Sequence, residues 1–122
     1  MDFKDNIPIY VQIEQYLYRE IIQGNLQAGQ KLPSVRQLAV KLTVNVNTVQ
    51  RALQEMNSHG ILYTKRGEGN FVTKDETLLA QMRKQTMDEE LAQFVENMRK
   101  YGLERDKLVQ ALTEYLEEHD ND

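Results

Sequence analysis

The chain has 122 residues, which is enough for one compact domain with a short extension but too few for a multidomain enzyme. Its 40% hydrophobic and 28% charged residues are ordinary for a folded globular chain, which excludes disorder throughout. It has no Cys, which excludes disulfides and thiolate-bound metals, and no apolar run long enough to span a bilayer. These features predict a cytoplasmic protein that is neither exported nor inserted into a membrane.

The net charge of −4 is unevenly distributed along the chain. Residues 1–74 carry nine basic and six acidic side chains, a balance of +3, whereas residues 75–122 carry six basic and thirteen acidic ones, a balance of −7. Such asymmetry indicates a basic part that meets a polyanion and an acidic part that is kept away from it. Two independently solvated surfaces would give the same charges, so the charge distribution alone does not show that the basic part binds a polyanion.

A first helix is predicted from about residue 8 to residue 23. Asn6 and Pro8 stand before it, apolar residues recur every four positions, and Gly24 ends it. The apolar stripe that we expect to face a core consists of Ile9, Ile13, Leu17 and Ile21. The segment before Pro33 then favours an extended conformation.

Two short helices joined by a tight turn are predicted next. Ser34 and Gln37 have the spacing of a capping box. The helix that they begin has an apolar face made of Val35, Leu38, Ala39 and Leu42. Asn45 is a good N-cap for the following helix, because its side-chain oxygen can accept a hydrogen bond from a backbone N–H two or three residues on. That helix ends at Gly60, and its apolar stripe consists of Val49, Ala52, Leu53 and Met56.

A hairpin is predicted after the third helix. Residues 61–64 and 70–73 are short runs of branched and aromatic side chains, which favour strands. Residues 65–69, Lys-Arg-Gly-Glu-Gly, are typical of a hairpin turn. The hairpin therefore has a basic tip.

The last third of the chain is predicted to be helical. Neither Gly nor Pro occurs between Lys74 and Gly102, so this stretch forms one long helix or two shorter ones. A final amphipathic helix from Leu108 to Leu116 precedes an acidic end. Such helices need a partner surface, and a second copy is the economical one because twofold homodimers are the commonest oligomers. The predicted dimerisation residues are Leu91, Phe94, Val95, Met98, Leu108, Val109, Leu112 and Leu116.

These elements predict a mainly α fold with a small β-hairpin wing (α+β), namely a winged helix-turn-helix followed by a two-helix dimerisation tail. We expect a DNA-binding domain at residues 1–74 and the helical dimerisation tail at residues 75–122. DNA offers phosphates to Lys and Arg and base edges to Asn, Gln and Arg. The polar and basic residues at the start of the third helix and at the hairpin tip are Asn45, Asn47, Thr48, Gln50, Arg51, Lys65 and Arg66.

The sequence resembles the GntR-type bacterial transcription regulators over about residues 7–73. The matching runs are Pro-Ile-Tyr-Val-Gln-Ile at 8–13, Gly-Asn-Leu-Gln-Ala-Gly at 24–29, Leu-Pro-Ser-Val-Arg-Gln-Leu-Ala at 32–39, Val-Asn-Val-Asn-Thr-Val at 44–49 and Arg-Gly-Glu-Gly-Asn-Phe-Val at 66–72. The short helical tail and the Asn-x-Asn-Thr-Val sequence are most similar to the YtrA-type subfamily.

The resemblance implies roles for individual residues. Arg36 would reach DNA and Ser34 would begin the second helix of the domain. The residues implied at the major groove, and at the wing tip near the minor groove, are Asn45, Asn47, Thr48, Arg66 and Gly67. Each role has a plainer alternative: an ordinary surface arginine at position 36, a cap alone at position 45, and a solvated turn at positions 65 and 66.

Three positions depart from the pattern of the family that the sequence resembles. Ala28 stands where the family prefers Pro, Thr43 where many members have a turn Gly, and Val46 where many members have a base-contacting Arg. The departures leave the fold prediction intact and make the operator sequence harder to predict.

The predicted function is a sequence-specific DNA-binding transcriptional regulator, a repressor that binds an inverted-repeat operator as a homodimer. The alternative is a winged-helix module for protein interaction or DNA architecture without operator specificity. No catalytic group, metal site or cofactor is expected, because the carboxylates gather in the tail and no catalytic or phosphate-binding motif occurs. Whether a small-molecule effector binds is left open by the sequence.

Overall fold

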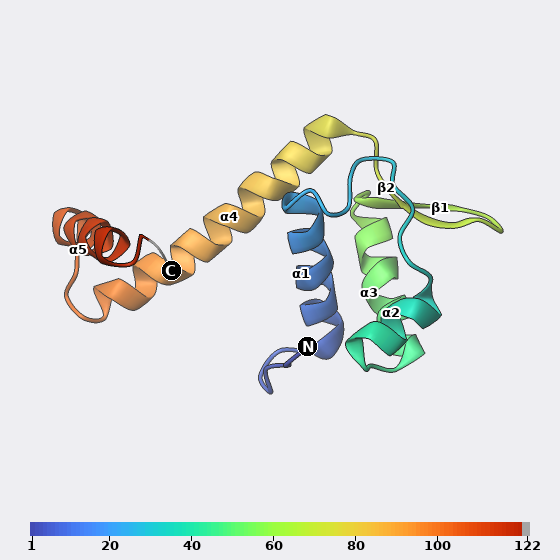
Figure 1. Ribbon diagram of the computed structural model, residues 1–122, viewed down its shortest axis with the longest axis horizontal. Coiled ribbons are helices and arrows are strands. Elements are labelled where there is room, and N and C mark those ends of the chain that lie inside the picture. Colours follow the sequence, from blue (N-terminus) through green and yellow to red (C-terminus); the bar gives the residue numbers. More distant parts are fainter. Residues whose placement is uncertain (121–122) are drawn as a thin grey trace. The chain divides into compact units, whose positions relative to one another are not determined.

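The computed structural model describes residues 1–120, which contain five helices and one two-stranded antiparallel sheet. In chain order the elements are α1 (Ile9–Ile22), α2 (Val35–Leu42), α3 (Val46–Ser58), β1 (Leu62–Lys65), β2 (Gly69–Val72), α4 (Glu76–Arg99) and α5 (Arg105–Glu118) (Figure 1). The predicted α fold with a hairpin wing is confirmed. The chain divides into two compact units, Met1–Gln81 and Met82–Asp122. Among residues 1–120, none of the helices combines the length and apolar character that crossing a bilayer requires.

The core of the first unit forms where α3 packs against α1, α2 and β1. The predicted stripe of α3 is buried, with each of its four members at most 3% exposed. From α1 the residues Ile13, Leu17 and Ile21 enter the same core, whereas Ile9 is 43% exposed. The prediction for Ile9 was therefore wrong, because this first residue of α1 lies beside the N-terminal arm, with which it lines an open pocket.

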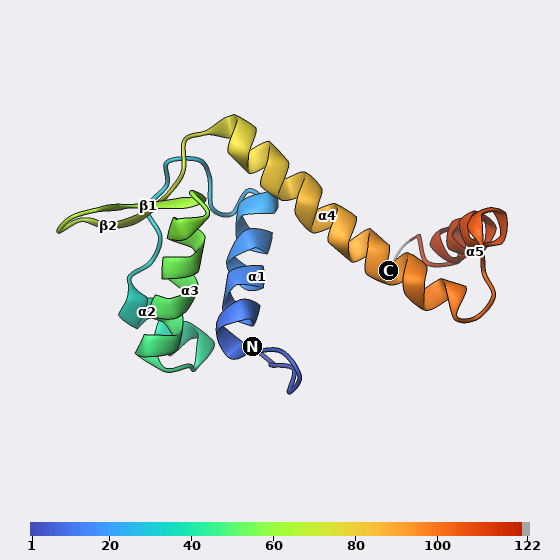
Figure 2. The ribbon, with the colours of Figure 1, turned by 180° about the vertical axis from the view of Figure 1, so that it is seen from behind.

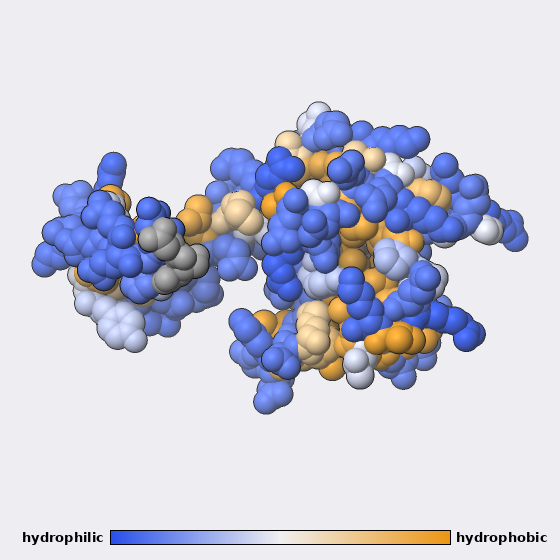
Figure 3. All heavy atoms as spheres, in the orientation of Figure 1, coloured by the Kyte–Doolittle hydropathy of each residue, from blue (hydrophilic) through white to orange (hydrophobic). Residues whose placement is uncertain are grey.

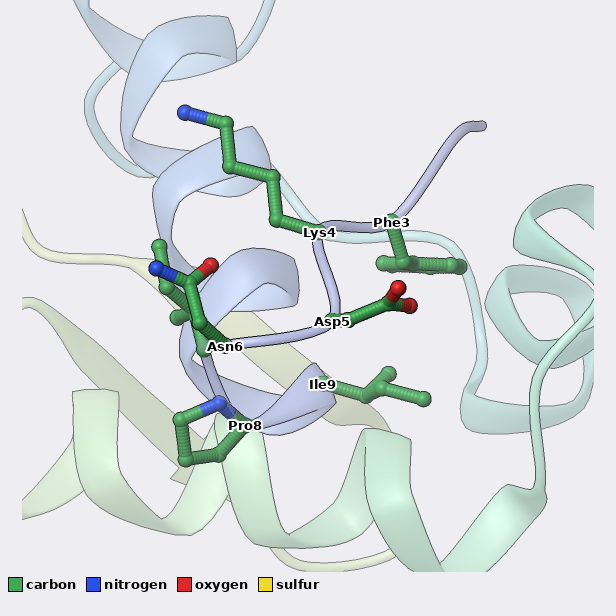
Figure 4. A pocket seen from close by; sticks show the side chains of 7 residues that line it. Phe3, Lys4, Asp5, Asn6, Pro8 and Ile9 are labelled. Carbon is green, nitrogen blue, oxygen red and sulfur yellow. The ribbon is translucent and has the colours of Figure 1, made fainter.

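The N-terminal arm, residues 1–8, is attached to α1 through the buried side chain of Gln12. Its Oε1 accepts a hydrogen bond from the Lys4 backbone N–H, and its Nε2 donates to the carbonyl oxygens of Lys4 and Ile7, each at 2.8 Å. Figure 4 shows Phe3, Asp5 and Ile9 on one side of the arm, with Lys4 pointing away from them. The complete pairing of Gln12 fits the rule that buried polar groups find partners.

A capping box begins α2 and one left-handed residue ends it. Ser34 and Gln37 form the predicted capping box, with the Ser34 hydroxyl accepting from the Gln37 backbone N–H at 3.1 Å and the Gln37 side chain accepting from the Ser34 N–H at 2.8 Å. Thr43 ends α2 with a φ of 57°, and it has the one positive φ outside glycine in the described chain. A β-branched residue is strained in this region.

The wing is a short hairpin in which Leu62 pairs with Val72 and Lys65 pairs with Gly69. Each strand is displaced by one residue from its predicted limits, toward the turn. The displacement follows from the turn itself, because the Glu68 N–H donates to the Lys65 carbonyl at 2.9 Å and Gly67 adopts a φ of 80°. Lys65 and Gly69 therefore belong to the strands, and the tip is residues 66–68.

The second unit contains most of α4 and all of α5. The stretch after the wing is one long helix, Glu76–Arg99, which decides between the two predicted possibilities. Gly102, with a φ of 80°, lies in the turn that leads to α5. No residue of α5 is buried, and Leu112 and Leu116 are 39% and 57% exposed.

Replacing Thr43 by Gly is expected to raise the free energy of unfolding by about 1 kcal/mol, because glycine adopts the left-handed conformation without a steric penalty. Urea denaturation at fixed protein concentration measures the change. The control is Thr86→Gly inside α4, which should lower stability because glycine disfavours helix interiors. A Thr43→Gly midpoint at or below that of the parent protein would contradict the strain.

Candidate nucleic-acid interface

The first turns of α3 present polar side chains on the face opposite its buried stripe. Asn45 caps the helix, and its Oδ1 accepts a hydrogen bond from the Asn47 backbone N–H at 2.8 Å. Asn47 and Gln50 are exposed, and Thr48 is half-buried. The structure thus brings Asn45, Asn47 and Gln50 to the accessible side of one helix end, where side-chain amides can pair with base edges.

The start of α2 supplies a second accessible group. Ser34 is the N-cap, and Arg36 is the second residue of the helix and is exposed. In a helix-turn-helix the first helix crosses the DNA backbone while the second lies in the major groove. In that geometry Arg36 has the position of a residue that meets phosphate or the edge of the groove.

The wing carries the third set of accessible side chains, and a hydrogen bond connects it to α3. The Thr64 hydroxyl donates to Asn70 Oδ1 across the hairpin at 2.7 Å, and Asn57 of α3 donates from Nδ2 to the same oxygen at 3.4 Å. Tyr63 stacks on Phe71 with ring centroids 5.5 Å apart. In Figures 1 and 2 the hairpin extends away from α1, α2 and α3, and its tip is exposed.

Both predicted basic residues of the wing are exposed. The Lys65 ammonium lies 4.8 Å from the centroid of the Phe71 ring, which limits where its charge can move. Arg66 and Gly67 are at the tip. Lys31, which the prediction did not include as a contact, joins the same region because it forms an isolated bridge with Phe71. Its charge was visible in the sequence, but its pairing with the wing depends on the fold.

Arg51 differs from the other predicted contacts. Its guanidinium lies over the ring of Tyr10 in α1, 3.9 Å from the ring centroid. This stacking joins α3 to α1 and gives Arg51 a role in the fold. Contact with DNA remains a prediction for Arg51. The sequence pattern did not reveal the pairing of Arg51 with Tyr10 because the two residues are 41 positions apart.

The bases of this surface are not neutralised by neighbouring carboxylates. Within residues 1–120, the single ion pair closer than 4 Å joins Lys84 to Asp88 in α4. A side-chain hydrogen bond with Tyr16 raises the pKa of Lys41 in α2, which favours the charged form of this lysine. Uncompensated positive charge on one unit attracts the phosphates of a nucleic acid.

A helix-turn-helix with a polar outer face, a basic wing and unneutralised cations defines a winged-helix DNA-binding protein. Residues 9–72 match the family described as "Bacterial regulatory proteins, gntR family". The chain belongs to this family and is a DNA-binding transcription regulator. It is 34% identical over 115 residues to the HTH-type transcriptional repressor YtrA of Bacillus subtilis, covering 93% of this chain and 88% of that one.

Solved structures agree with this assignment. A GntR family transcriptional regulator from Listeria monocytogenes has a TM-score of 0.86 and 38% sequence identity, covering 92% of this chain and 98% of that one. The DNA-binding domain of AraR in complex with operator ORX1 has a TM-score of 0.56 and 28% identity, covering 59% of this chain and 93% of that one. The resemblance to the YtrA-type subfamily is thereby confirmed, including the helices after the wing.

Two substitutions of Asn45 separate capping from DNA contact. Asn45→Ala removes the cap acceptor and is expected to lower the free energy of unfolding by about 1 kcal/mol. Asn45→Asp keeps an acceptor at the helix N-terminus, so stability should persist, while its negative charge near phosphate should weaken DNA binding. Thermal unfolding and fluorescence titration with duplex DNA measure the two effects. Undiminished DNA affinity in Asn45→Asp would place this side chain away from the phosphates.

Proposed function

We propose that this protein is a homodimeric repressor in the cytoplasm that binds an inverted-repeat operator. Residues 1–74 form the DNA-binding part and residues 75–122 form the dimerisation tail. The role requires no catalytic step and no cofactor. The observation that carries the proposal is the exposed polar start of α3, flanked by bases on α2 and on the wing that have no carboxylate partner within 4 Å in the described chain.

DNA contacts are proposed for the three surfaces described above. The start of α3 would enter the major groove, with Asn47 and Gln50 toward base edges. Arg36 would lie at the border of the groove and the wing tip would follow a neighbouring backbone. The complexes of the AraR domain with operators support this arrangement, because that domain has the same fold. The proposed DNA-binding set is Ser34, Arg36, Asn45, Asn47, Thr48, Gln50, Arg51, Lys65, Arg66 and Gly67.

Dimerisation through the tail is supported by its uncovered apolar side chains. Leu91, Val109 and Leu116 are each more than half exposed, and none of the residues of α5 is buried. Side chains of this size lose about 1.5–3 kcal/mol each when they stay in water instead of being buried. A second tail would cover them and give the protein two reading heads for a twofold-symmetric site.

Repression is proposed because YtrA, to which the chain is similar over nearly its whole length, is described as a repressor. A bound dimer can block a promoter without any further activity. The acidic tail would avoid the DNA backbone, which leaves the basic heads as the part that approaches it.

The test is selection of bound sequences from a random duplex library with the full-length protein. We expect enrichment of an inverted repeat with half-site centres about 10 base pairs or a multiple apart, since each head reads one turn of the major groove. Sedimentation should give the mass of two chains. Enrichment of no sequence beyond general duplex affinity would support the alternative, an architectural or protein-docking module.

A pair of tail variants checks the dimer. Leu112→Glu buries a charge in the proposed contact and should give a monomer with weakened operator binding. Gln110→Glu adds the same charge at an exposed polar position of α5 and should remain a dimer. Equal masses for the two variants would contradict a contact through Leu112.

Arg36→Ala is expected to weaken operator binding by about 1–3 kcal/mol, the usual range for a contact to a base edge. Fluorescence titration with the operator and with a random duplex distinguishes the two kinds of contact. A larger loss on the operator indicates base recognition, whereas equal losses and a slope of log K against log salt that is smaller by about 0.9 indicate phosphate. Unchanged affinity for both duplexes would remove Arg36 from the interface.

A further inference from the structure

The first helical residue of α3 is an exposed apolar side chain between two polar residues in the sequence. Val46 is 39% exposed, and its neighbours Asn45 and Asn47 are exposed polar residues. Figure 3 shows hydrophobic surface in the region of α2 and the start of α3, on the unit that carries the basic groups. A second exposed valine, Val40, lies in the last turns of α2 with 80% of its surface accessible.

Val46 is not one of the core residues of α3. The buried residues of this helix begin at Val49. Valine is also a weaker helix former than most unbranched residues because its branched side chain loses rotamer freedom. A single exposed apolar residue is common on protein surfaces, but this one lies at the end of the helix that a helix-turn-helix inserts into the major groove.

The major groove contains one apolar group, the C5-methyl of thymine, which alkyl side chains can contact. We propose that Val46 is a specificity-determining residue that packs against a thymine methyl group in each operator half-site. This inference rests on the proposed operator binding. The cap fits the assignment, because Asn45 uses its Oδ1 to accept a hydrogen bond from the Asn47 N–H, and Val46 is the first residue of the helix that follows.

A protein partner is a weaker explanation for this valine. Interfaces between proteins depend on a contiguous buried core of apolar and aromatic side chains. Val46 has polar residues on both sides in the sequence, and the exposed positions that follow it in α3, namely Asn47, Gln50 and Arg51, are all polar. Within this helix Val46 is therefore a single exposed apolar residue, which one methyl group can contact.

The experiment removes the methyl groups from the DNA. In the selected operator, each thymine of one half-site is replaced in turn by deoxyuridine, which keeps the base-pairing edge and lacks the methyl. For the full-length protein, one replacement is expected to weaken binding about fourfold, the effect of one buried carbon. Val46→Ala should bind the thymine and deoxyuridine operators equally at that position.

Val40→Ala is the matched control, because it shortens an exposed valine by the same two carbons on the helix that crosses the backbone. This variant should keep the fourfold discrimination of the parent protein. Full discrimination in Val46→Ala, or a parent protein insensitive to every replacement, would overturn the inference while operator binding stands. A library without any enriched sequence would overturn the proposed function and this inference together.

Discussion

The architecture depends on the burial of one face of α3. Val49, Ala52, Leu53 and Met56 are almost completely excluded from water, and α1, α2 and β1 all pack against this helix. Each large apolar side chain buried in this way stabilises the fold by roughly 1.5–3 kcal/mol. Because these contacts fix the rotation of α3 about its axis, they also determine which residues face outward. The surface that we propose for DNA binding is therefore a consequence of core packing.

Local features of this arrangement could be predicted from the sequence, and contacts between distant elements could not. The caps at Ser34 and Asn45 involve residues two or three positions apart, so their spacing is visible in the sequence. The buried stripe of α3 follows from helical periodicity in the same way. The stacking of Arg51 on Tyr10 depends on how two helices pack, and nothing in the local pattern of either residue indicates it.

The candidate site shows the same difference between local features, which the sequence predicts, and contacts between distant residues, which it does not. Residue type and position predicted an exposed polar helix start and a basic hairpin tip. The strand limits were displaced by one residue because the hydrogen bond from Glu68 to Lys65 closes a tighter turn than composition alone indicates. The bridge that joins Lys31 to the wing was also missed, since an isolated pair of residues has no periodic pattern. Sequence reasoning therefore found the surface but not the contacts that hold it in place.

Because α3 buries one face and exposes the other, substitutions on its two faces have different effects. Substitutions on the buried face alter a close-packed core, where a change of a few methylene groups costs several kcal/mol. Substitutions at Val46, Asn47 or Gln50 alter groups that solvent already reaches, so the core and the caps persist. In the proposed function, the DNA sequence that α3 reads can thus vary while the fold is conserved. Val46, which stands where many members of the family have arginine, is on the exposed side. We expect this difference to affect which base is bound and not the stability of the fold.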